Sequence, residues 1–115
     1  ELNIAYSSRV VGDNERARVF IDFNQEPKFQ IRYLKNPNRI IIDLEETKLA
    51  LGDEQLTARG ILSDIRYGIM AEDKSRIIIS LNEPAVLEDQ QMQIRRLLML
   101  KLFTSNATFV RNYFN

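Results

Sequence analysis

The chain has 115 residues, which is enough for one domain with a single hydrophobic core. Its 16 basic residues balance its 16 acidic residues, and this balance argues against nucleic acid or an anionic membrane as the main partner. Cysteine and histidine are both absent, which excludes disulfides, Ser-His-Asp triads, Cys-His pairs and zinc sites built on those ligands. No apolar run approaches the roughly 20 residues of a membrane span.

Alternating apolar residues predict strands along most of the chain. Val19, Ile21 and Phe23, for example, share one face of an extended segment, and this period of two is typical of a strand. We expect eight strands, near residues 2–11, 16–24, 27–34, 39–45, 61–70, 75–82, 85–93 and 96–104. Residues 35–38 (KNPN) predict a turn, because proline presets its φ angle and asparagine tolerates the left-handed region.

Two segments lack this alternation. Residues 47–60 join the two halves as a crossover, and within it residues 49–60 predict a short helix or another structured connection that ends at Gly60. The tail, residues 105–115, has apolar side chains at a spacing that allows one or two helical turns. The chain begins at Glu1 without methionine or a signal-like segment, so we expect it to be a processed or trimmed part of a longer protein.

The two halves of the chain resemble each other. The segment RVFIDFNQEP at residues 18–27 returns as RIIISLNEP at residues 76–84. Arg18 and Arg76 are 58 residues apart, as are Ile40 and Leu98. A repeat of this length indicates a duplicated supersecondary unit. We therefore predict one domain over residues 1–115, with repeats at about 3–46 and 61–104, a crossover at 47–60 and a tail at 105–115.

Eight short strands with a single candidate crossover favour an antiparallel arrangement, because parallel strands need long connections. The predicted fold class is all-β, a pseudo-symmetric two-sheet β-sandwich with a short helical crossover. Its core should be formed by the inward residues of the four strongest strands. They are Val19, Ile21, Phe23, Ile40, Ile42, Leu44, Ile77, Ile79, Leu81, Leu98, Leu100 and Leu102.

The opposite faces of these strands carry the candidate binding residues. A face that mixes arginine with aromatic and aliphatic groups can hydrogen-bond sugar hydroxyls and carboxylates while apolar groups cover rings. The candidates on these faces are Arg18, Phe20 and Arg76. On the strand that opens the second half, Arg66, Tyr67 and Gly68 are candidates because a glycine beside an arginine permits close approach of a ligand or a partner backbone. Arg9 is the residue that the repeat matches to Arg66. The alternative is that the arginines are solvated or protect exposed strands, and that Gly68 marks a bulge.

We predict no catalytic residue, metal ligand or cofactor site in the chain. A pair of carboxylates could still act as acid and base, but Asp13, Glu15, Glu72 and Asp73 lie in predicted turns, where acids bond to backbone or water. An acid-pair glycosidase would need two outward carboxylates roughly 5–9.5 Å apart in a cleft. No glycine-rich phosphate loop is present.

The ordered set of motifs resembles the AMIN domain, which stands at the N-terminus of bacterial periplasmic N-acetylmuramoyl-L-alanine amidases and in some secretins. The set comprises RVVG at 9–12, RVFIDF at 18–23, NPNRIIIDL at 36–44, IRYG at 65–68 and SRIIISL at 75–81. It extends from about Asn3 to Thr104. The family's Arg-x-Gly motif corresponds to Arg66 and Gly68, with Arg9 at the matching place in the first half.

The resemblance implies a non-catalytic domain that binds peptidoglycan and targets a cell-wall amidase to the septum or envelope in the periplasm. Divisome or other envelope proteins are further expected partners. The zinc-dependent catalytic domain would then lie downstream of Asn115. The alternative is a protein–protein docking module of an outer-membrane secretin or another envelope assembly, which would use a sheet edge or an apolar outer face.

Overall fold

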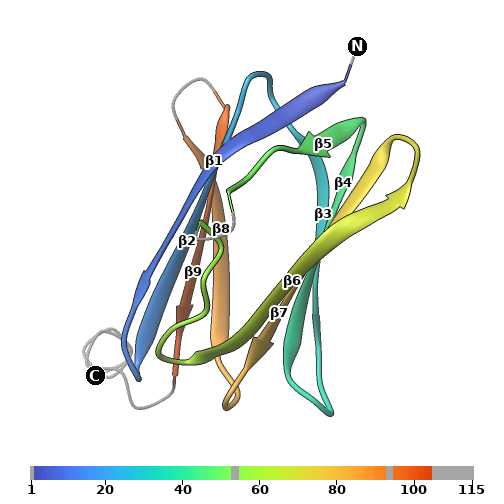
Figure 1. The fold of residues 1–115 in the computed structure, drawn as a ribbon. Helices are drawn as coiled ribbons and strands as arrows, with labels where there is room; N and C mark the ends of the chain where they lie inside the picture. Colours follow the sequence, from blue (N-terminus) through green and yellow to red (C-terminus); the bar gives the residue numbers. More distant parts are fainter. Residues whose placement is uncertain (1, 53–54, 93–94, 105–115) are drawn as a thin grey trace.

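The computed structural model describes residues 2–52, 55–92 and 95–104, and these residues form nine strands and no helix. The strands make two sheets that pack face to face as a β-sandwich (Figure 1). The strands are β1 (Asn3–Gly12), β2 (Arg16–Phe23), β3 (Lys28–Leu34), β4 (Arg39–Glu45), β5 (Thr47–Leu49), β6 (Leu62–Ala71), β7 (Lys74–Leu81), β8 (Val86–Met92) and β9 (Leu97–Phe103). The predicted fold class and the eight predicted strands are confirmed, and β5 is an addition.

Both sheets combine strands from the two halves of the chain. One sheet has the order β5-β1-β2-β9-β8 and the other has the order β3-β4-β7-β6. All neighbouring strands are antiparallel except β5, which runs parallel to β1. The bounds of β7, β8 and β9 lie 58 residues after those of β2, β3 and β4. Two copies of one unit would give this arrangement, although the duplication itself stays a prediction.

The predicted helical crossover is wrong in the part that the structure describes. Residues 47–49 form β5, and residues 50–52 and 55–60 contain turns and irregular backbone. This segment follows the free edge of β1: the amide of Ala50 donates to the carbonyl of Ala5 (2.9 Å), and the amide of Ser8 donates to Oε1 of Gln55 (2.7 Å). An edge strand needs such partners for its backbone groups, and here the crossover supplies them. The predicted helical turns at 105–115 lie outside the described residues.

The hydrophobic core lies between the two sheets. All twelve predicted core residues are buried, from Val19 to Leu102. The end of the crossover closes one side of this core, because Leu56, Ile61 and Leu62 are buried with them. A fully buried side chain of this size stabilises a fold by about 1.5–3 kcal/mol, so this core can hold the sandwich together without disulfide or metal.

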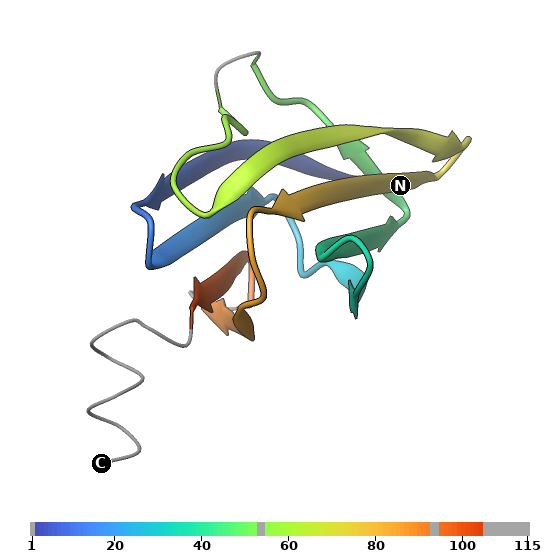
Figure 2. The ribbon, with the colours of Figure 1, turned by 90° about the horizontal axis from the view of Figure 1, so that it is seen from below.

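A part-buried polar contact connects the two sheets near one end. The hydroxyl of Tyr33, on β3, accepts a hydrogen bond from the amide of Ala85, just before β8 in the other sheet (3.1 Å). It also lies 3.2 Å from Oδ1 of Asn38. The bond to Ala85 ties β3 to the start of β8, and the ribbon of the two sheets is seen from below in Figure 2.

Two glycines differ in what surrounds them. Gly60 has φ +59°, and a Cβ there would lie 2.0 Å from the carbonyl oxygen of Asp13. The amide of the next residue, Ile61, donates to that same carbonyl, so the close approach is part of the turn. Gly68, on β6, has no atom within 4 Å of an added Cβ. The turn at 35–38 is confirmed, with Asn36 in the left-handed region at φ 58°.

We predict that Gly60→Ala destabilises the domain by more than about 1 kcal/mol, because the new methyl group meets backbone and the positive φ angle disfavours alanine. Gly68→Ala is the matched control and should change the free energy of unfolding by less than about 0.5 kcal/mol. Urea unfolding followed by circular dichroism measures both. Equal losses for the two variants would contradict this interpretation of Gly60.

Candidate functional site

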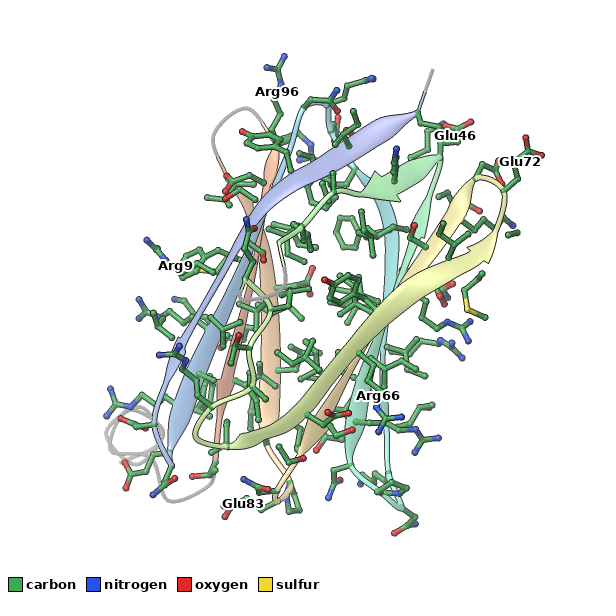
Figure 3. The ribbon with its side chains drawn as sticks, in the orientation of Figure 1. Arg9, Glu46, Arg66, Glu72, Glu83 and Arg96 are labelled. Atoms are coloured by element: carbon green, nitrogen blue, oxygen red, sulfur yellow. The ribbon has the colours of Figure 1, made fainter. Side chains whose placement is uncertain are left out.

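The predicted binding residues divide between the two outer faces of the sandwich. Arg9, Arg18 and Phe20 lie on the outer face of the five-stranded sheet, and Arg66, Gly68 and Arg76 lie on the outer face of the four-stranded sheet. Figure 3 shows Arg9 and Arg66 on opposite sides of the molecule. The candidates therefore form two separate surfaces and cannot contact one small ligand together.

On the five-stranded sheet, Arg9 covers an aromatic ring. Its guanidinium carbon lies 4.5 Å from the centroid of Phe20, which is its partner on β2. A cation placed over a ring in this way contributes about 0.5–1 kcal/mol at an exposed site. In the next row, Arg18 stands opposite Lys101 of β9. Lys101 stands in turn opposite Glu88 of β8, so this row places two neighbouring cations beside one acid.

On the four-stranded sheet, the equivalent row contains an ion-paired cluster. Arg76 of β7 stands opposite Asp43 of β4, with Nε 2.7 Å from Oδ1 and Nη2 3.4 Å from Oδ2. Arg32 of β3 places Nη2 3.3 Å from the same Oδ2. The hydrogen bond from Arg76 is the main cause that lowers the pKa of Asp43 below its ordinary value of 3.8, and the charges of Arg76 and Arg32 add to it.

The adjacent edge strand, β6, has an open position next to this cluster. Gly68 stands opposite Arg76, and the absence of a side chain leaves a gap on the outer face. Two residues before it, Arg66 is 82% exposed and donates from Nε to Oδ2 of Asp64 (2.8 Å). Arg66 stands opposite the half-buried Ile78, so the gap is bordered by two guanidinium groups and an apolar side chain.

A hollow of about 790 Å³ begins at the same cluster and extends toward the end of the sandwich. Its wall includes the Asp43–Arg76 ion pair and the exposed side chain of Met70. Its other polar lining residues include Gln30, Lys28 and Lys74. The hollow therefore borders the gap on its Arg76 side, and its wall carries charges of both signs.

One predicted residue points away from this surface, as strand alternation requires for the neighbour of Arg66, and one residue that was not predicted joins the surface. Tyr67 was expected among the binding residues, but it stands opposite the core residue Ile77 and points to the other side of β6 from Arg66. Arg32 was missed. The alternation of β3 would have pointed its side chain outward, yet its place beside Asp43 depends on the pairing of β3 with β4.

The described residues show no grouping of acidic side chains suited to a metal ion. Among them there is also no helix that could cross a membrane. Asp13, one of the turn acids, accepts backbone hydrogen bonds from Glu15 (2.8 Å) and Arg16 (2.9 Å), as expected for an acid in a turn.

The sequence model of the AMIN domain matches residues 8–102, which include strands of both sheets and both outer faces. The chain belongs to the AMIN domain family. AMIN domains are non-catalytic, and they are known in peptidoglycan-associated amidases and in secretins. No curated protein matches the chain in sequence.

We predict that Asp43→Asn destabilises this AMIN domain by about 1 kcal/mol at neutral pH, because Arg76 and Arg32 lose their shared carboxylate in a half-exposed site. A carboxyl whose pKa is lowered by folding stabilises the fold above its unfolded pKa, and the contribution disappears as the pH falls through the lower, folded pKa. The difference between the wild type and Asp43→Asn should therefore shrink below about pH 3.8.

Urea unfolding at a series of pH values measures this difference. Asp64→Asn removes a more exposed ion pair with Arg66 and is the control, for which we expect a smaller effect at neutral pH. A difference for Asp43→Asn that stays constant down to pH 2 would contradict the prediction.

Proposed function

We propose that this AMIN domain binds peptidoglycan through the outer face of its four-stranded sheet and so localises a cell-wall N-acetylmuramoyl-L-alanine amidase in the periplasm. The observation that carries the proposal is the gap at Gly68, which lies between the exposed Arg66 and the positioned Arg76. Membership of the AMIN family supports the envelope location and a role in binding without catalysis.

The chemistry of this face suits a polymer of sugars and short peptides. Guanidinium groups bind carboxylates through paired hydrogen bonds, and peptide stems end in carboxylates. Asp43 holds Arg76 in a fixed position, which reduces the entropy that binding must remove. A glycine on a strand permits close approach to the backbone, and Ile78 and Met70 provide apolar contact for ring or side-chain carbons.

The five-stranded face is a second binding surface in this proposal. Arg9 and Phe20 offer a cation on an aromatic ring. Arg18 and Lys101 would accept an anionic group, with Lys101 shared with Glu88 on its other side. The two faces point in opposite directions, so one domain could contact two strands of the cell wall (Figure 3).

The alternative, docking within a secretin or another envelope assembly, belongs to the same family. The residues that follow Asn115 in the parent protein would decide between the two. Histidine and glutamate zinc ligands there would support the amidase, and a long β-rich region would support the secretin.

Arginine substitutions test which face binds. We predict that Arg66→Ala and Arg76→Ala each weaken binding to purified sacculi by roughly tenfold, as expected for the loss of one charge-assisted contact. Arg59→Ala, at an exposed position in the crossover, removes the same charge and should have little effect. Co-sedimentation with sacculi over a range of protein concentrations measures the affinities.

Arg9→Ala in the same assay reports on the five-stranded face, and we expect it to weaken binding less than Arg66→Ala. If Arg59→Ala weakens sedimentation as much as Arg66→Ala, the binding comes from general surface charge. If the wild type stays in the supernatant at low and moderate salt, the proposed function is wrong.

A glycine substitution tests the gap. Gly68→Leu should fold like the wild type, because no atom lies within 4 Å of the new Cβ, and it should reduce sacculus binding at least tenfold by filling the gap. Gly52→Leu is the matched control, because its nearest neighbour, a side-chain nitrogen of Gln55, is 3.8 Å away. Unchanged binding of Gly68→Leu would move the ligand site elsewhere.

A further inference from the structure

Most strands at the margins of the two sheets are protected against pairing with another chain. The free edge of β1 is covered by β5 and by Gln55. Strand β3 follows the buried Pro27 and carries Lys28 and Arg32, and β8 carries the exposed acids Glu88 and Asp89. Charges, proline and coverage are the usual devices by which proteins prevent edge-to-edge association.

The edge of β6 lacks these devices over its second half. Tyr67 is 38% exposed, Ile69 is 74% exposed and Met70 is 57% exposed. Beyond its ladder with β7, the described part of the chain provides no hydrogen-bond partner for the backbone of residues 63–71. The ladder has irregularities between Leu62 and Asp64 and between Ile69 and Ala71, so the segment 64–69 between them is regular. In Figure 1, β6 forms the margin of the four-stranded sheet.

We propose that β6 pairs with β6 of a second copy of this chain, antiparallel and centred on Tyr67, so that the two four-stranded sheets become one continuous sheet. The strand is complementary to itself in this register. On the core side, Ile65 stands opposite Ile69 of the second copy, and the two Tyr67 side chains meet at the axis. On the outer side, Arg66 stands opposite Gly68 of the second copy, where no side chain is in its way.

Charge favours this register over its neighbours. Residues that stand directly opposite each other point to the same side of a sheet. In a symmetric pair of identical strands, one residue must therefore stand opposite its own copy, and the register is named by that central residue. Moving the centre by one residue changes every pair. Centring on Arg66 would place two arginines face to face, and centring on Gly68 would place Asp64 opposite Glu72. Both arrangements set like charges opposite each other, which is destabilising.

A third register, centred on Ile65, pairs Asp64 with Arg66 but leaves Ile69 and Met70 without partners on the other strand. The register centred on Tyr67 covers these exposed side chains. Its two Arg66 side chains become diagonal neighbours, and each already has its own Asp64 at 2.8 Å to compensate its charge. Apolar burial and charge therefore select the same pairing.

Sedimentation velocity over a range of concentrations tests the association. The wild type should shift from the chain mass of 13.5 kDa toward twice that mass as the concentration rises. Ile69→Lys places a cation opposite Ile65 at both ends of the seam, and it should weaken dimerisation at least tenfold. Val86→Lys is the matched control, an exposed apolar residue on another edge strand, and it should dimerise like the wild type.

Cysteine cross-linking tests the register, and the natural absence of cysteine makes each variant a single-thiol protein. Opposite residues in an antiparallel pair have Cα atoms about 4.5–5.5 Å apart, which falls within disulfide range. Tyr67→Cys should therefore form a covalent dimer under mild oxidation. Ile65→Cys and Ile69→Cys should cross-link when mixed, and each alone should cross-link at least tenfold less.

A wild type that remains a monomer at every soluble concentration overturns the proposal, as does a dimer that Ile69→Lys leaves unchanged. A Tyr67→Cys variant that cross-links no faster than Val86→Cys overturns the register. Circular dichroism of Ile69→Lys confirms that it folds, which is expected because this side chain is 74% exposed. These assays contain no sacculi, so their outcome is independent of peptidoglycan binding.

Discussion

The pairing of β2 with β9 and of β4 with β7 is the constraint on which the rest of the structure depends. Each pairing joins a strand of the first half to a strand of the second, and each lies at the centre of its sheet. Ile21 stands opposite Leu98 and Ile42 stands opposite Ile77, all fully buried. Neither half can bury these side chains by itself, because its two hairpins belong to different sheets. The core therefore forms from both halves together.

The same pairings assemble the candidate binding face. Strand β7 has β4 on one side and β6 on the other, so Arg76 is placed between Asp43 and the gap at Gly68. These positions are far apart in the sequence, and no local motif contains them all. Because central strands are held on both sides, Arg76 is well positioned, whereas Arg66 on the edge strand is exposed. The proposed site therefore has one cation held by a carboxylate and one cation that is exposed.

The two outer faces share a geometry but differ in chemistry. Arg76 faces a carboxylate, Asp43, across its sheet, while Arg18, at the corresponding place on β2, faces Lys101. One face therefore carries a carboxylate between two arginines beside an open gap. The other carries two neighbouring cations with Glu88 beside one of them, and an arginine over an aromatic ring. This difference supports two binding surfaces with separate preferences. It also explains why a similar fold in the two halves does not require a shared ligand.

The sequence by itself determined the strands, their inward faces and the absence of histidine and cysteine chemistry, since period-two alternation and composition are local properties. It also carried the AMIN motifs. The prediction of a helix failed in the crossover, residues 47–60. Its described residues instead supply hydrogen-bond partners to the backbone along the edge of β1. The tertiary structure decided which outward residues meet, because strand order and register arise from burial of the whole core. Arg32 lies beside Asp43, and the second half of β6 is an unprotected edge, for this reason.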